Sequence, residues 1–127
     1  ALRLRQTLII EDASGKPLVR IQDRPLRLRE VMEIEDASGG NLAMVKKAMI
    51  APLRQRYNID LSDGGQLTAQ GNILDHEYEI ESGGTKVAEV SRRWFRVRDT
   101  YGVQIAPGQN TVLLLAVAVC LDQMAVG

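Results

Sequence analysis

The chain has 127 residues, in which 16 lysines and arginines balance 16 aspartates and glutamates. This length predicts a single domain, residues 1–127, with one buried core. The charge balance excludes a global field that would attract nucleic acid or an anionic membrane, so such binding would need a local patch. The single cysteine, Cys120, cannot form an internal disulfide, which is typical of a reducing compartment. We therefore expect a cytoplasmic protein, with peripheral membrane association as the alternative.

A stretch of fourteen residues occurs twice near the start of the chain. LRLRQTLIIEDASG begins at Leu2, and LRLREVMEIEDASG begins 24 residues later at Leu26. In both copies the leucines, isoleucines and methionine fall on even positions, except Ile9, and the arginines fall on odd positions, which predicts strands with one buried face. Asp, Ser and Gly residues that favour turns follow each strand, and the apolar stretches PLVRI and NLAMV then predict a returning strand. Each copy therefore predicts a β-hairpin.

Three further strand pairs are expected along the chain. A degenerate third copy reads PLRQRYNIDLSDGGQLTAQG, a fourth hairpin reads HEYEIESGGTKVAEV, and a last strand pair begins at WFRVRDTYGVQI. Their apolar faces hold Tyr57, Ile59, Tyr78 and Ile80. Short strands with glycine-bearing turns at regular spacing indicate an antiparallel meander or barrel, and they exclude a parallel sheet that alternates with helices.

The C-terminal run VLLLAVAVCL, from Val112, has no polar side chain except the thiol of Cys120. It predicts a helix over residues 111–125 with Asn110 as N-cap, and a strand is the alternative. A helix that is apolar all round must be buried all round, and this one is too short to cross a bilayer. We therefore expect a mainly β fold, a closed or nearly closed antiparallel barrel of about nine or more strands around a central helix.

Three segments carry a resemblance to a known family: GNILDHEYEI from Gly71, VAEVSRRWFRVRDTYGV from Val87, and the ending LLLAVAVCLDQM. They resemble the LURP-one-related family, whose fold is that of the tubby C-terminal domain and the phospholipid scramblases. The resemblance implies a twelve-stranded barrel around a hydrophobic C-terminal helix. Family members usually begin with further strand sequence ahead of the position of Ala1. The resemblance therefore implies that this chain lacks N-terminal strands, and that closure would need those strands or a second copy of the chain.

The resemblance also implies a modest range of functions. Tubby domains bind phosphoinositides, and scramblases are proposed to move lipids, but most family members have no established biochemical activity. The resemblance thus implies a non-enzymatic module that binds a phospholipid headgroup or another anionic ligand at the membrane surface. A protein-interaction or structural module is the alternative, and scramblase-like activity is a remote one. No tubby lipid-site motif is present in this sequence, so no residue role carries over.

Arginine pairs of the form R-x-R are the most repeated feature of the expected outer surface. If neighbouring strands align them, their guanidinium groups could hold phosphorylated headgroups by bidentate bonds. The competing interpretation is a neutralised surface, because acidic residues at the other ends of the same faces could pair with the arginines: Glu11, Asp12, Glu33, Glu35 and Asp36. The candidate ligand-binding residues are Arg3, Arg5, Arg27, Arg29, Arg54, Arg56, Arg96 and Arg98.

No residue pattern predicts a catalytic, metal or cofactor site. The triplet Asp75-His76-Glu77 holds the one histidine, but alternation places His76 inside and both carboxylates outside, so we expect a single structural hydrogen bond. Cys120 is expected to be a small buried hydrophobic residue. No zinc-ligand spacing or phosphate-binding loop occurs. Trp94 could stack on bases, but aromatic residues are scarce, so no nucleic-acid partner is expected.

Overall fold

A computed structural model describes the chain except for residues 1–6, 24–30, 50–54, 74, 93–101 and 127. The described residues form nine strands and one helix, and the strands make a single antiparallel sheet in chain order. The elements are β1 (Thr7–Glu11), β2 (Pro17–Asp23), β3 (Val31–Asp36), β4 (Asn41–Met49), β5 (Gln55–Leu61), β6 (Gln66–Asn72), β7 (Glu77–Ser82), β8 (Thr85–Ser91), β9 (Gly102–Ile105) and α1 (Thr111–Val126).

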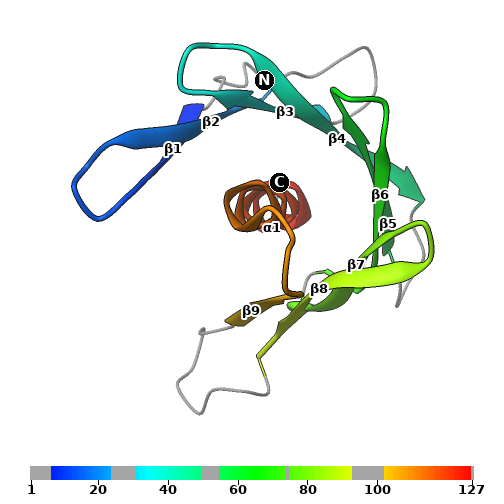
Figure 1. Ribbon diagram of the computed structural model, residues 1–127. Coiled ribbons are helices and arrows are strands. Elements are labelled where there is room, and N and C mark those ends of the chain that lie inside the picture. Colours follow the sequence, from blue (N-terminus) through cyan, green and yellow to red (C-terminus); the bar gives the residue numbers. More distant parts are fainter. Residues whose placement is uncertain (1–6, 24–30, 50–54, 74, 93–101, 127) are drawn as a thin grey trace.

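The sheet curls around α1, which runs through its concave side (Figure 1). The helix packs against β2, β3, β4 and β9. Strands β1 and β9 stand at the two ends of the strand order, and among the described residues they are not paired with each other. A barrel closes only when its first and last strands share hydrogen bonds. The mainly β fold with a C-terminal helix is therefore confirmed, but the described residues form an open sheet and not the closed or nearly closed barrel that we expected.

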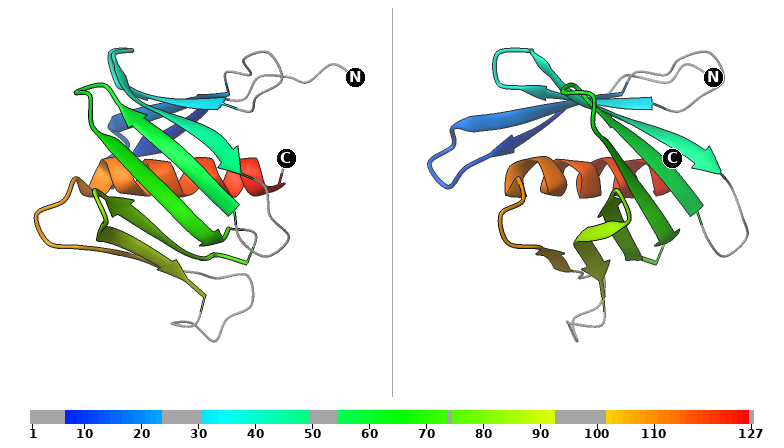
Figure 2. Two further views of the ribbon diagram at one scale, coloured as in Figure 1. Left: turned by 90° about the vertical axis from the view of Figure 1, so that its right-hand side faces the viewer. Right: turned by 45° about the vertical axis from the view of Figure 1, so that its right-hand side comes forward.

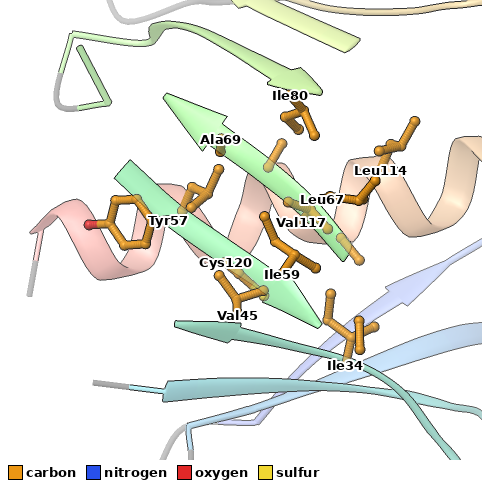
Figure 3. Packing of buried hydrophobic residues seen from close by; sticks show 14 of the residues in the cluster. Ile34, Val45, Tyr57, Ile59, Leu67, Ala69, Ile80, Leu114, Val117 and Cys120 are labelled. Atoms are coloured by element: carbon orange, nitrogen blue, oxygen red, sulfur yellow. The ribbon is translucent and has the colours of Figure 1, made fainter. Parts of the chain in front are cut away.

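The alternation in the sequence predicts the inner face of the sheet correctly. Every second residue along β2 to β7 is buried on this face: Val19, Ile21, Met32, Ile34, Ala43, Val45, Tyr57, Ile59, Leu67, Ala69, Tyr78 and Ile80. Figure 3 shows several of them between the strands and Leu114, Val117 and Cys120 of α1. Ile9, the exception in the pattern, is 51% exposed.

The two copies of the repeated stretch fold into equivalent hairpins. In the first, Leu8 pairs with Ile21, and a β-bulge follows Ile10. In the second, Met32 pairs with Val45, and a bulge follows at the equivalent place, after Ile34. The pairing register and the irregularity are thus both repeated 24 residues later.

One position of the second hairpin departs from the expected outer surface. Glu35 lies opposite Arg20 of β2 and is only 7% exposed, although the alternation assigns it to the solvated face. The register shift beside it leaves the extra residue, Leu42, in β4, so Glu35 keeps its outward position. It is covered because β3 has a neighbouring strand on both sides. The expected exposure of Glu35 is therefore wrong.

The helix expected over residues 111–125 is present as α1. The side-chain oxygen of Asn110 accepts a hydrogen bond from the backbone N–H of Leu113 at 3.1 Å, which confirms the N-cap. Burial on every side is wrong, because Leu115 is 37% exposed while Leu114 and Leu121 are buried. The sheet therefore does not cover α1 on every side. Among the described residues, no helix is long and apolar enough to cross a membrane.

Candidate functional site

The two ends of the curled sheet are built differently. Successive strands run in opposite directions, so the hairpin turns at residues 12–16, 36–40, 62–65 and 82–84 all lie beside the start of α1. We call this the turn end (Figure 2, left panel). The strand ends at Asp23, Val31, Met49, Gln55 and Gly102 lie at the other end, where α1 finishes. We call it the connection end, since the longer connections of the chain leave it and return to it.

Most of the candidate arginines lie outside the described residues. These are Arg3, Arg5, Arg27, Arg29, Arg54, Arg96 and Arg98. Arg56 is described: its side chain is exposed at the beginning of β5, next to the connection end. Trp94 and Tyr101 also lie outside the described residues. The structure thus places one of the eight candidates, and it places that one on the outside, as the alternation predicts.

Charge is divided unequally between the described and the remaining residues. The described residues hold 14 of the acidic and 7 of the basic side chains. The remaining residues hold 9 arginines and 2 acidic side chains. All of these charged residues belong to the segment before β1 or to the connections between β2 and β3, β4 and β5, and β8 and β9, which are anchored at the connection end. The net charge of the whole chain is zero, but the described residues, which we call the acidic body, have an excess of acidic side chains, and the connections are rich in arginine.

Two acids that were expected to neutralise the arginines have a local role at the turn end. The Oδ1 atom of Asp12 accepts hydrogen bonds from the Ser14 hydroxyl at 2.6 Å and from the Lys16 backbone N–H at 3.0 Å. Asp36 repeats these contacts with Ser38 and Gly40 at 2.8 Å each. The hydrogen bonds from the serine side chains and from the backbone hold the pKa of both carboxyl groups below its ordinary value.

Two lysines of the acidic body are engaged in ion pairs on the outer face. The Nζ atom of Lys46 lies 2.9 Å from Asp60, and its hydrogen bond lowers the pKa of that carboxyl group. The Nζ atom of Lys86 lies 3.0 Å from Glu89, and this hydrogen bond raises the pKa of the lysine. Such exposed pairs contribute little to stability, because solvent and salt screen them. They leave these two lysines less available for an anionic ligand.

The side chains of Asp75, His76 and Glu77 diverge, as expected. The Asp75 carboxylate accepts a hydrogen bond from the Asn72 amide, and the Glu77 carboxylate accepts one from the Ser91 hydroxyl. His76 lies in a turn with φ +56° before β7 and reaches toward α1. His76 therefore contacts Asp122 of α1, but it does so from a turn and not from the strand that alternation predicted.

Comparison with known proteins supplies the family. A sequence model of LURP-one-related proteins matches residues 1–122. The chain belongs to the LURP-one-related family. The match covers both copies of the repeated stretch and reaches Asp122 in α1, so the resemblance drawn from the three segments is confirmed. Neither curated proteins nor solved structures gave a match to this LURP-one-related chain.

The thiol of Cys120 in this LURP-one-related chain is fully buried between α1 and the sheet (Figure 3). Burial raises its pKa to about 12, so the group stays protonated at neutral pH. The expectation of a small buried hydrophobic residue is confirmed. In the part of the chain that the structure describes, no group of three or more His, Cys, Asp and Glu side chains could hold a metal ion.

One surface hollow of about 270 Å³ lies over β8 and β9 of the LURP-one-related domain. Lys86, Glu89, Gln104, Ile105 and Pro107 contribute to its lining. Sequence reasoning missed this hollow, since its polar residues have the ordinary outward positions of a strand. Its lysine already binds Glu89. The hollow therefore offers little to an anion.

Proposed function

We propose that this LURP-one-related protein is a non-enzymatic module that binds a phospholipid headgroup or another anionic ligand at a membrane surface. The observation that carries the proposal is the division of charge along the sequence, with nine arginines in the segment before β1 and in the connections that join β2 to β3, β4 to β5 and β8 to β9, and an excess of acidic side chains among the described residues. Arginine suits this role because its planar guanidinium group can bind two phosphate oxygens at once.

Several arginines must act together in such a site. The C-terminal end of α1 carries the negative end of the helix dipole, and the Asp122 carboxylate lies near the same end. Both oppose an approaching anion. Binding should therefore depend on the summed positive charge and weaken as salt screens it.

We also propose that the open sheet is the larger part of a tubby-like barrel. The proposal is supported by nine consecutive antiparallel strands that curl around one apolar helix, which is the arrangement such a barrel requires. The uncovered side of α1 between β1 and β9 is the place where further strands would complete it (Figure 1).

The test of anion binding is co-sedimentation of the chain with vesicles of phosphatidylcholine that contain a phosphoinositide, at low salt. Arg56→Glu is expected to weaken retention about fivefold, because it reverses a charge beside the connection end. Lys16→Glu makes the same charge change at the exposed turn end and should leave retention unchanged. Equal losses in both variants, or no retention of the unaltered chain, would contradict the proposal.

A further inference from the structure

The turn between β6 and β7 is held by hydrogen bonds among its own residues. The Asn72 side-chain amide donates one to the Asp75 carboxylate at 3.0 Å, and its oxygen accepts one from the Asp75 backbone N–H at 3.1 Å. The backbone N–H of His76 donates to the carbonyl oxygen of Ile73 at 3.1 Å. Within this turn His76 adopts φ +56°, and its imidazole reaches α1. The turn therefore fixes where the ring lies.

Asp122 stands at an electrostatically unfavourable place on α1. It lies just before the last turn of the helix, and none of residues 123–126 is basic. The C-terminal end of a helix carries partial negative charge, which repels a carboxylate and attracts a cation. Within the described part of the chain, the ion-pair partner recorded for Asp122 is His76, with Nε2 and Oδ1 3.5 Å apart. A positive charge on the imidazole would therefore offset two sources of negative charge at once.

The charged residues next to His76 along the chain are engaged elsewhere or exposed. The Asp75 carboxylate is bound within the turn, and the Glu77 carboxylate accepts hydrogen bonds from the Ser91 hydroxyl and the Arg92 backbone N–H at 3.0 Å each. Arg92 itself is exposed. His76 is the one histidine of the chain, and imidazole is the side chain that ordinarily changes its charge between pH 5 and pH 8. The charge of this described region near neutral pH therefore depends on that ring.

We propose that His76 and Asp122 form a pH-sensitive contact that regulates anion binding by this protein. Protonation turns the contact between a neutral ring and a carboxylate into an ion pair. The pair lies near the C-terminal end of α1, at the connection end (Figure 2). The added positive charge therefore reduces the negative charge that opposes an approaching anion there. The regulation rests on the proposed anion binding, whereas the contact itself can be tested without a ligand.

The charges of the pair determine the direction of the pH effect. Because the Asp122 carboxylate attracts the protonated ring of His76 and not the neutral one, the contact contributes to stability at low pH. That contribution is lost as the pH rises through the range in which imidazole releases its proton. The side chains of His76 and Asp122 are 23% and 30% exposed, so solvent screens the pair in part and its effect is modest.

The contact is tested first by urea unfolding without ligand, at pH 5.5 and at pH 8. The unaltered chain, His76→Asn, Asp122→Asn and the double variant give the coupling between the two side chains. We expect a coupling of about threefold in the unfolding equilibrium constant at pH 5.5 and almost none at pH 8. Lys46 and Asp60, 2.9 Å apart on the outer face, are the control, because an ion pair without histidine should show the same coupling at both pH values. Equal coupling of His76 and Asp122 at the two pH values would overturn the proposal.

The regulation is tested by co-sedimentation with vesicles of phosphatidylcholine that contain a phosphoinositide, at low salt and at the same two pH values. The lipid phosphates also take up protons in this range, so each variant is compared with the unaltered chain at the same pH. His76→Asn should be retained as well as the unaltered chain at pH 8 and about twofold less at pH 5.5.

The two experiments separate the possible failures. A pH-dependent coupling with the same retention ratio at both pH values would overturn the regulation and leave anion binding intact. No retention of the unaltered chain at either pH would overturn the regulation together with the proposed function, whatever the coupling.

Discussion

The Nε2 atom of His76 lies 3.5 Å from the Oδ1 atom of Asp122, so the turn between β6 and β7 contacts the last turns of α1. Both side chains are partly exposed, and the backbone of His76 has φ +56°, a value that few residues other than glycine adopt. A residue held in this conformation needs surrounding contacts to maintain it. The pair therefore connects the sheet to the central helix at the connection end.

We expect His76→Asn to lower the free energy of unfolding by about 1 kcal/mol, because asparagine tolerates the positive φ but cannot reach Asp122 in the same way. Urea unfolding of this variant, of Asp122→Asn and of the double variant gives the coupling between the two side chains. A coupling of about 0.5 kcal/mol is expected. Strictly additive losses would show that the two side chains do not interact.

Gly71 in β6 provides a test of close packing between strands. Its φ is +138°, and a Cβ atom at this position would lie 2.7 Å from the carbonyl oxygen of Glu77. Gly71→Ala should therefore lower the free energy of unfolding by about 3 kcal/mol. Gly39→Ala is the control, since Gly39 also has positive φ, +95°, but has nothing within 4 Å of the added atom. Gly39→Ala should lower the free energy of unfolding by about 1 kcal/mol. Equal losses in the two variants would contradict the contact at Gly71.

The turn aspartates predict how stability depends on pH. The pKa of Asp12 and of Asp36 is held below the ordinary 3.8, so the folded state favours their charged forms. This contribution is present above that value and is lost as the pH falls through the lower pKa of the folded state. Thermal unfolding between pH 2 and pH 6 should show a smaller acid-dependent loss in the variant with Asp12→Ala and Asp36→Ala than in the unaltered chain. Parallel curves would contradict the assignment.

Much of the fold follows from local sequence patterns. The doubled LRLR and EDASG stretches and their alternation predict the hairpins, and the inward positions of Ile34, Tyr57 and Ile80 are correct. The burial of Glu35 carries no such signal, because it depends on how β3 is covered by the strands on both sides of it. Closure of the sheet likewise depends on strands β1 and β9, which are distant in sequence.

The candidate site was only partly predictable. Alternation predicts that Arg27 and Arg29 are outward residues of a strand. Both lie outside the described residues, so this prediction stays a prediction. A second signal was present in the sequence, since the R-x-R pairs precede successive hairpins. In an antiparallel meander, the segments between hairpins all return to one end. The connectivity of the chain therefore indicates where the arginine-rich segments are anchored, which the strand pattern alone does not.

Adjacent leucines of α1 test whether one side of the helix is uncovered in solution. Leu114 is buried against the sheet, and Leu115 is 37% exposed. Leu114→Ala should lower the free energy of unfolding by about 3 kcal/mol through the loss of packing and the cavity left behind. Leu115→Ala should cost about 1 kcal/mol or less, since little of its surface leaves water on folding. Both changes favour helix formation equally, so chemical denaturation of the two variants isolates burial. Equal costs would mean that Leu115 is covered in the folded protein.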